Sequence, residues 1–500
     1  MVIDLTRLMV PSRRIKKGVA SLLSHPEFSE PPGICIGLGS RGEPVFWPRP
    51  SATQASHALV LAASGTGKSV LTAYAVCAQF IESYFQRPEE ECETVFLVDP
   101  KGDLVSLVFG MIACHAPELL PQVQYLNPFE QGFPFNLNHL EAGNTPLDIR
   151  AWQLATLASE TSTATGSQRH LGTGARQLDV LTNLLLAALS LDDPQASVLL
   201  ALDALTMPKG LKLLGSICNS ERARQFLLSA NLSDELKASC AARLRLAFAA
   251  TESLEHLVST PNCISFPELL SPGKLTLIDL GSPTGGLAPL QRFWANLLVR
   301  LGVDHLLSRK SPWQGHHARL VIDEAQLVAS VLSEQAENLL TTGRSRGISL
   351  TLLSQGTVLL KEASNSLLRV LMGNAPIKIL GRLSAPDAEL MAKEMAPQPG
   401  ISETTAVMRR RVLGSLTNLP DQQFMFMSPG KREPFIAQWV NLENWESATQ
   451  YFSAQIQTMT NRFRVETRTR RLHLWDISPP KQKRRAQSRK TATRTNTRWG

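Results

Sequence analysis

One octapeptide constrains the fold of this 500-residue chain more than any other segment. Residues 62–69 read Ala-Ala-Ser-Gly-Thr-Gly-Lys-Ser, between a short apolar run at 57–61 and a segment, 70–83, with apolar residues at helical spacing. A strand, a glycine-rich turn and a helix in this order point successive backbone N–H groups toward the centre of the turn, where they can bind a phosphate. The positive end of the helix faces the same point and attracts the negative charge. The segment is therefore predicted to be a phosphate-binding P-loop.

The residues of this turn have distinct expected roles. Gly65 and Gly67 let the backbone approach the phosphates, Lys68 reaches the β- and γ-phosphates, and the Ser69 hydroxyl coordinates Mg²⁺. An ordinary glycine-rich turn with a stray lysine is the alternative, but the strand, the helix and the Gly-Lys-Ser triplet agree with one another. The residues expected to bind the nucleotide, ATP, are Ser64, Gly65, Thr66, Gly67, Lys68, Ser69 and Val70.

A second glycine motif is not expected to bind a nucleotide. Gly37, Gly39 and Gly42 satisfy G-x-G-x-x-G, but a dinucleotide fingerprint requires a helix to open at its last glycine. Here Pro44 and a further apolar run follow, so 31–50 is predicted to be a β-hairpin.

The order of apolar runs predicts the fold class. Runs typical of buried strands lie at 95–98, 274–280, 318–322, 349–354 and 376–380, and helical patterns lie at 290–307, 327–342, 358–372 and 386–395. From 145 to 261 the pattern is helical, including 233–257, with Ser220 and Ser233 as expected helix N-caps. Strands that alternate with helices imply a parallel sheet. We therefore predict an α/β protein with a mostly parallel central sheet, interrupted by an all-helical insertion.

Composition and pattern divide the chain into four parts. These are a lead and hairpin at 1–50, an α/β nucleotide-binding domain in two segments at 51–144 and 262–440, the helical insertion at 145–261, and an extension at 441–500. The last strands of the α/β domain are expected at 424–426 and 435–440, as an edge hairpin. After Asn461 the apolar pattern stops, which predicts a disordered basic tail from 462.

Acidic residues at strand ends supply the second part of an ATPase site, because the metal and the attacking water both need one. Two predicted strands end in acids. Asp99 stands alone before Pro100 and Lys101, whereas Asp323 and Glu324 form a pair. We assign Asp323 to Mg²⁺ and Glu324 to the attacking water as general base. A solvated Asp-Glu start of a helix is the alternative.

Three further polar residues near the next strand are candidates for catalysis. Gln355 ends the strand 349–354, where a γ-phosphate sensor is expected, and a simple polar strand end is the alternative. Arg344 and Arg346 stand in the turn before that strand. An arginine there can project onto the ATP of a neighbouring subunit and stabilise transition-state charge, and Arg344 is preferred for this role.

Positive charge is concentrated at the carboxyl terminus. The chain has 51 Lys+Arg against 43 Asp+Glu, a net charge of +8. Residues 462–500 hold 13 of these bases and two acids, a net of +11, so the rest of the chain carries −3. With Trp475 and Trp499, this tail fits contacts with a nucleic-acid backbone and base stacking. An anionic membrane surface and a solubilising disordered end are the alternatives.

The compartment is inferred from what the sequence lacks. No apolar run reaches the roughly eighteen residues of a membrane span, and residues 1–17 mix acids and bases without the apolar core of a signal peptide. The seven cysteines are scattered, without a C-x-x-C pair. We expect a cytoplasmic protein without disulfides or structural zinc; peripheral contact with the inner membrane through the basic tail is the alternative to a location free in the cytoplasm.

Five segments together resemble one known family. They are 62–69, Val-Asp-Pro-Lys-Gly-Asp-Leu at 98–104, Pro-Phe-Asn-Leu at 134–137, Val-Ile-Asp-Glu-Ala-Gln-Leu at 321–327, and Gly-Arg-Ser-Arg-Gly-Ile-Ser-Leu-Thr-Leu-Leu-Ser-Gln at 343–355. From about residue 30 to 440 the chain resembles the conjugative coupling proteins of type IV secretion, of the TraD/TraG type within the FtsK/HerA superfamily of ring ATPases. Alanine at the first P-loop position, as at Ala62, is common in that family.

The resemblance implies a RecA-like P-loop NTPase that forms a hexamer, uses ATP and Mg²⁺ and is stimulated by DNA. Such a ring would feed single-stranded DNA, with its attached relaxase, into a secretion channel. The family usually begins with transmembrane helices, and none is present in this sequence. Other expectations therefore stay open: a coupling protein anchored by a separate subunit, a HerA/FtsK-like DNA pump outside conjugation, or a nucleotide-bound recruitment adaptor without motor activity.

Overall fold

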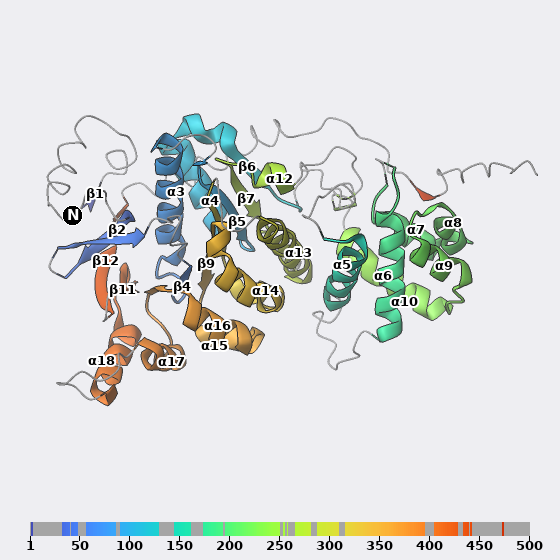
Figure 1. The fold of residues 1–500 in the computed structure, drawn as a ribbon. Coiled ribbons are helices and arrows are strands. Elements are labelled where there is room, and N and C mark those ends of the chain that lie inside the picture. The colour runs from blue at the N-terminus through green and yellow to red at the C-terminus, as the bar shows by residue number, and fades with distance from the viewer. Residues whose placement is uncertain are drawn as a thin grey trace, which may run out of the picture.

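Helices surround a large, mostly parallel sheet in the part of the chain that the computed structural model describes (Figure 1). The described residues are 2–3, 33–40, 42–48, 57–86, 91–129, 145–161, 174–193, 196–250, 254–255, 258, 266–281, 288–309, 316–395, 405–428, 434–439, 441–442 and 473–474. The predicted α/β fold class, with its mostly parallel central sheet, is confirmed.

Eleven of the described strands make up the large sheet. In spatial order they are β3 (Pro44–Pro48), β2 (Gly33–Gly39), β12 (Phe435–Trp439), β11 (Gln423–Met427), β10 (Ile377–Leu380), β4 (Ala58–Leu61), β9 (Ile348–Ser354), β8 (Ala318–Ile322), β5 (Thr94–Asp99), β7 (Leu275–Asp279) and β6 (Val123–Leu126). Neighbours from β10 to β6 are parallel. The pairs β10–β11, β11–β12, β12–β2 and β2–β3 are antiparallel. A separate short pair joins β1 (Val2–Ile3) to β13 (Asn441–Leu442).

The central strands are rich in apolar residues because both of their faces are covered. Every residue of β4, β5, β8 and β9 is buried. Parallel strands with helices on both faces have such continuous apolar runs in place of an alternating pattern. This is why runs such as 318–322 could be recognised as strands from the sequence alone.

The direction of each crossover decides which face its helices cover. The helices α3 (Lys68–Gln86) and α4 (Asp103–His115) connect β4 to β5 and β5 to β6, toward one end of the sheet. The return path from β7 to β10 runs through α13 (Ala288–Leu307), α14 (Ala329–Thr342), α15 (Thr357–Ala363) and α16 (Asn365–Asn374). Because such crossovers are right-handed, the two groups cover opposite faces, as Figure 1 shows.

This arrangement opens a crevice beyond the carboxyl end of β4. The chain leaves β4 for α3 on one face of the sheet and leaves the adjacent β9 for α15 on the other. Loops that diverge in this way from neighbouring parallel strands make the ligand crevice of open α/β sheets. The fold therefore places residues 62–69 at the mouth of that crevice.

A set of helices fills the described chain between β6 and β7. They are α5 (Leu147–Thr161), α6 (Ala175–Leu189), α7 (Leu199–Thr206), α8 (Gly210–Ile217), α9 (Glu221–Ser229), α10 (Asp234–Phe248) and the short α12 (Phe266–Leu269). Ser220 accepts a hydrogen bond from the backbone N–H of Ala223, and Ser233 accepts one from Leu236, so both predicted N-caps are confirmed. α5 packs against α13 and joins this helical set to the sheet (Figure 1). The division into domains stays a prediction.

Several elements differ from the expectation. α4, β6 and α18 (Thr405–Asn418) were not predicted, and α10 ends at Phe248, well before 257. The helix expected at 358–372 is two helices, because the Ser364 hydroxyl accepts a hydrogen bond from the N–H of Leu367 and starts α16 anew. The helix α17 (Ala385–Met395) lies close to its expected position.

The hairpin predicted at 424–426 and 435–440 does not lie at the edge of the sheet, so this prediction is wrong. The pair β11–β12 exists, but β12 also pairs with β2, and β3 forms the edge of the sheet on that side. The hairpin predicted at 31–50 thus extends the same sheet. Its strand β2 ends 396 residues before β12 begins, and local pattern carries no information on pairings between such distant segments.

The described part of the basic tail consists of His473 and Leu474, and both contact α7. Leu474 is fully buried, and its N–H donates to Asp203 Oδ2 at 3.2 Å. His473 Nδ1 lies 3.3 Å from the same oxygen. The tail therefore contacts the helical set at this point, which its composition did not predict. The rest of 462–500 lies outside the described residues.

Helix length and polarity bear on membrane insertion. α13 has 20 residues but includes Arg292, Arg300 and Asp304. Within the described ranges, no helix combines the length and the apolar character that crossing a bilayer requires.

Candidate functional site

The turn at 62–69 has the conformation of a phosphate cradle. Gly65 and Gly67 have φ of +79° and +88°, in the left-handed region that favours glycine. Thr66 closes the turn, because its hydroxyl donates to the Ala63 carbonyl at 2.7 Å. α3 begins at Lys68 and has no acidic side chain in its first turn, so no acid of the helix itself offsets the positive helix end that faces the turn.

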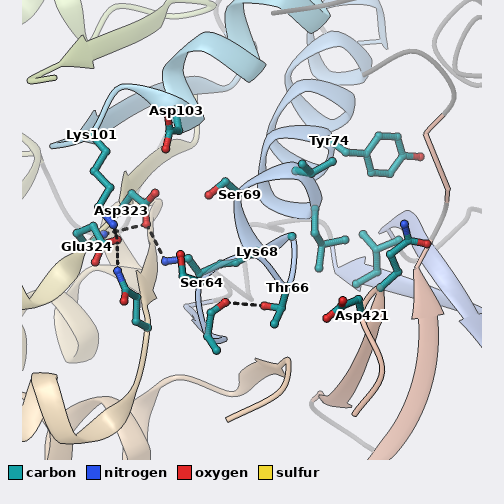
Figure 2. A pocket seen from close by; sticks show the side chains of 18 residues that line it. Ser64, Thr66, Lys68, Ser69, Tyr74, Lys101, Asp103, Asp323, Glu324 and Asp421 are labelled. Atoms are coloured by element: carbon teal, nitrogen blue, oxygen red, sulfur yellow. Dashed lines mark hydrogen bonds and ion pairs between the residues drawn. The ribbon is translucent and has the colours of Figure 1, made fainter. Parts of the chain in front are cut away.

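A cavity of about 500 Å³ lies beside this turn (Figure 2). All seven positions expected to bind the nucleotide, Ser64 to Val70, line it. Asp323, Glu324 and Gln355 line it from the ends of β8 and β9. Residues from three parts of the sequence that were predicted to form one site therefore surround a single cavity.

Asp323 forms an ion pair with the P-loop lysine. Lys68 Nζ lies 3.2 Å from Asp323 Oδ1, and the two side chains are only 8% and 4% exposed. Burial raises the pKa of Asp323, while the positive charge of Lys68 acts in the opposite direction. Oδ1 also accepts the N–H of Glu324 at 2.8 Å. The carboxylate is thus fixed beside the P-loop, at hydrogen-bonding distance from its lysine.

Glu324 is held by three side chains in an unusual backbone conformation. Its φ of 47° and ψ of 51° are left-handed, which is uncommon outside glycine. Oε1 accepts hydrogen bonds from Lys101 Nζ and, at 2.8 Å, from Gln355 Nε2, and Oε2 accepts one from Gln326. Burial opposes ionisation of this carboxyl, but the bonds from Lys101 and Gln355 outweigh burial and hold the pKa of Glu324 below its ordinary value.

Asp99 has a structural role at the end of β5. Oδ1 accepts the N–H of Lys101 at 2.8 Å, and Oδ2 accepts the N–H groups of Leu104 and Val105 at 2.7 and 3.2 Å. Burial and the nearby charge of Asp323 raise the pKa of Asp99 to about 7. Oδ1 is occupied by the turn before α4 and Oδ2 by the first turn of α4, so this acid starts a helix while Asp323 and Glu324 face the cavity.

The arginine turn lies at the other end of the strands. Arg344 and Arg346 form a short 3₁₀ turn directly before β9, whereas the cavity is at the carboxyl end. Arg344 is exposed, and its charge adds to burial in lowering the pKa of His57, which precedes β4, to about 4. Arg346 donates to the carbonyls of Leu307 and Arg309 at the end of α13. The fold thus does not bring Arg344 to the cavity of its own chain.

Comparison with known proteins gives the fold a context. No family model and no curated protein matches the sequence. VirB4 of Thermoanaerobacter pseudethanolicus superposes with a TM-score of 0.54 at 16% identity, over 84% of this chain and 99% of that chain. The bacterial conjugative coupling protein TrwBdeltaN70, in a trigonal form with sulphate, gives 0.52 at 17% identity, over 85% and 92%. The chain has the fold of VirB4 and TrwB.

TrwB has also been solved in complex with a nucleotide. Its complex with ADP and Mg²⁺ superposes on this chain with a TM-score of 0.50 at 18% identity, over 84% of this chain and 92% of TrwB. In the present chain, the Ser69 hydroxyl and the Asp323 carboxylate are oxygen donors that line the same cavity. Hard oxygen ligands of this kind suit Mg²⁺, so these two side chains could hold the ion.

Sequence analysis missed two groups of cavity residues. Lys101 and Asp103 follow β5 in the Asp-Pro-Lys-Gly-Asp segment, where only Asp99 was considered as a site residue. Ile36, Tyr74, Asp421 and Gln422, from β2, α3 and the turn before β11, also line the cavity. Figure 2 shows Tyr74 and Asp421 on the side of the P-loop away from Lys101 and Glu324. Lys101 could have been predicted from the sequence, because a charged residue directly after a buried parallel strand indicates a side chain at the carboxyl edge of the sheet, where ligands bind. Asp421 could not, because only the non-local pairing of β10 with β11 brings its turn to the P-loop.

Proposed function

We propose that this protein is an ATP-driven DNA translocase of the coupling type. It hydrolyses ATP as a ring, most simply a hexamer, and moves single-stranded DNA toward a type IV secretion channel. The observation that carries the proposal is the convergence of Lys68, Asp323, Glu324 and Gln355 on one cavity beside a P-loop. The TrwB fold supports it, since TrwB is described as a conjugative coupling protein and was solved with ADP and Mg²⁺.

The proposed hydrolysis uses the residues in distinct roles. Lys68 and the N–H groups of 64–69 hold the phosphates, and Ser69 with Asp323 hold Mg²⁺, which neutralises phosphate charge when bound. Glu324 takes a proton from the attacking water. At the same time the water oxygen bonds to the γ-phosphorus, and the bond between the γ-phosphorus and the β-γ bridging oxygen breaks. Gln355, bonded to Glu324, senses the γ-phosphate and orients the water.

An arginine from a neighbouring subunit completes the proposed site. Arg344 lies too far along its own sheet to serve its own ATP, as described above, but it is exposed at the amino end of β9. In a ring, one subunit can present this end of its sheet to the carboxyl end of the next. We therefore assign Arg344 to the transition-state charge of the adjacent ATP.

The cargo and its partners follow from the coupling-protein proposal. A relaxase attached to the DNA and the proteins of the secretion channel are the expected partners, and the basic tail provides contact with DNA or with an anionic membrane surface. A DNA pump outside conjugation would share the motor but not these partners. A nucleotide-bound adaptor would share the site but lack turnover.

ATP hydrolysis by the purified protein, with and without single- and double-stranded DNA, tests the proposal. We expect turnover that rises severalfold with DNA, more with single strands. Binding of ATP without turnover under any of these conditions would favour the adaptor. A rate of ATP hydrolysis that is the same without DNA, with single strands and with double strands would contradict the proposal of a DNA translocase.

The contribution of the tail to DNA binding can be separated from its contact with α7. Residues 481–500 carry eight bases and no acid, and they lie beyond Leu474. Replacing these eight bases with glutamine keeps the length of the chain and the buried contact of Leu474. The plot of log K against log salt for single-stranded DNA is then expected to lose up to about 6 units of slope. An unchanged slope would show that this segment makes no phosphate contacts.

A further inference from the structure

In this structure each acid at the end of β8 has its own lysine (Figure 2). Lys68 pairs with Asp323, and Lys101 pairs with Glu324. Both carboxylates are only 4% exposed. A buried carboxylate without a partner is costly, so the two lysines stabilise the acids in the absence of ligand.

Lys101 is presented to the cavity by a turn with strict requirements. Its N–H is fixed by Asp99 Oδ1 at 2.8 Å, and the next residue, Gly102, has φ of +84°. A Cβ at Gly102 would also lie 2.6 Å from Asp279 Oδ1. Both the backbone conformation and the lack of space therefore require glycine at this position. The backbone at Lys101 is therefore well fixed, while its side chain is 48% exposed and ends in the cavity.

Binding of a nucleotide is expected to disrupt both pairs. Lys68 must turn from Asp323 to the phosphates to act as a P-loop lysine. A terminal phosphate would then approach the buried carboxylate of Glu324, and two like charges at close range repel strongly where water is excluded. Among the described residues that line the cavity, Lys68 and Lys101 are the two with a fixed positive charge, against Asp103, Asp323, Glu324 and Asp421.

We propose that Lys101 is a second phosphate-binding residue. In the ligand-free site it restrains Glu324, and when ATP binds it turns to the terminal phosphate. Two consequences follow for the site. Glu324 Oε1, which accepts from Lys101 and Gln355 in this structure, is released to accept a proton from water only when a terminal phosphate is present. ADP lacks that phosphate, so Lys101 stays on Glu324 and the site distinguishes ATP from ADP.

This inference rests on the proposed ATP site, and the experiment separates the two. The affinities of wild type and Lys101→Met for ADP and for a non-hydrolysable ATP analogue are measured by calorimetry. Methionine keeps most of the side-chain stem without the charge. We expect the affinity for the analogue to fall at least about tenfold, the loss of one charge-assisted contact, while the affinity for ADP changes less than about twofold.

Control variants make the outcome specific. Lys101→Arg keeps the cation and is expected to retain preference for the analogue. Lys212→Met, at an exposed position of α8, is expected to match wild type for both ligands. Equal weakening of both ligands by Lys101→Met, or no weakening of the analogue, would overturn the inference while the ATP site stands. Failure of wild type to bind either ligand would instead overturn the proposed function.

A second measurement on the wild-type chain needs no variant at position 101. Acetylation of lysine amines is followed by mass spectrometry in the absence of ligand, with ADP and with the analogue. Lys101 is half-exposed, so it is expected to react in the ligand-free and ADP-bound protein and to be protected severalfold by the analogue. Equal reactivity of Lys101 with ADP and with the analogue would contradict its turn to the terminal phosphate. Lys212 reports any general change in reactivity.

Discussion

Replacement of Lys68 by alanine is expected to abolish ATP binding and hydrolysis. The Lys68 side chain is 8% exposed, at the start of α3, and no other P-loop position carries a charge. Its ammonium would make charge-assisted contacts with two phosphates, each worth about 1.5–3 kcal/mol. We therefore expect the affinity for ATP to fall by a factor of about 10²–10⁴ and DNA-stimulated turnover to become undetectable. Calorimetry and a phosphate-release assay measure the two quantities.

The same substitution leaves Asp323 buried without its cation, so loss of structure must be separated from loss of binding. Lys68→Met, which fills the space of the stem, and a comparison of circular dichroism spectra provide that control. Lys212→Ala on α8 controls for removal of a lysine elsewhere. Near-normal affinity for ATP in a folded Lys68→Ala protein would mean that the nucleotide binds outside the cavity described here.

Replacement of Glu324 by glutamine is expected to separate binding from chemistry. Glutamine has nearly the same shape and can still accept a hydrogen bond from Lys101 or Gln355, but it cannot take a proton from water. The kcat for ATP should fall by about 10²–10⁴, the usual contribution of a general base, while the affinity for ATP is retained. Steady-state kinetics and equilibrium binding on the same preparation measure both effects.

The matched control for this variant is Glu221→Gln. Glu221 is exposed on α9 and pairs with Arg224 within its own helix, far from the cavity in the chain. It should turn over ATP like wild type. If Glu324→Gln kept more than about a tenth of the wild-type kcat, the general base would have to be another group.

Much of the fold could be predicted from the sequence, because the patterns that indicate it lie within short segments of the chain. The P-loop, the buried run before Asp323 and the strand that ends before Gln355 are each recognisable from residues next to one another in the chain. Parallel strands also end at the same edge of a sheet, so residues at their carboxyl ends could be expected to meet. Of the predicted site residues, Lys68, Asp323, Glu324 and Gln355 do meet at one cavity, and their chemical roles remain proposals.

What the sequence did not predict depends on contacts between distant segments. Because β2 pairs with β12, the expected edge hairpin lies inside the sheet, and Ile36 of β2 lines the cavity beside the P-loop. The ion pair of Lys101 with Glu324 joins residues 223 positions apart. Leu474, in a segment whose composition is that of a disordered tail, is buried against α7. None of these contacts leaves a periodic signal in the residues around it.

The most direct test of the account is an experimental structure of the protein with Mg²⁺ and a non-hydrolysable ATP analogue. We predict that the phosphates lie in the turn 64–69, that Lys68 has left Asp323, and that Lys101 has left Glu324 for the terminal phosphate. Phosphates bound elsewhere would contradict the ATP site. Phosphates in the turn with the Lys101–Glu324 pair intact would contradict the switch and leave the ATP site standing.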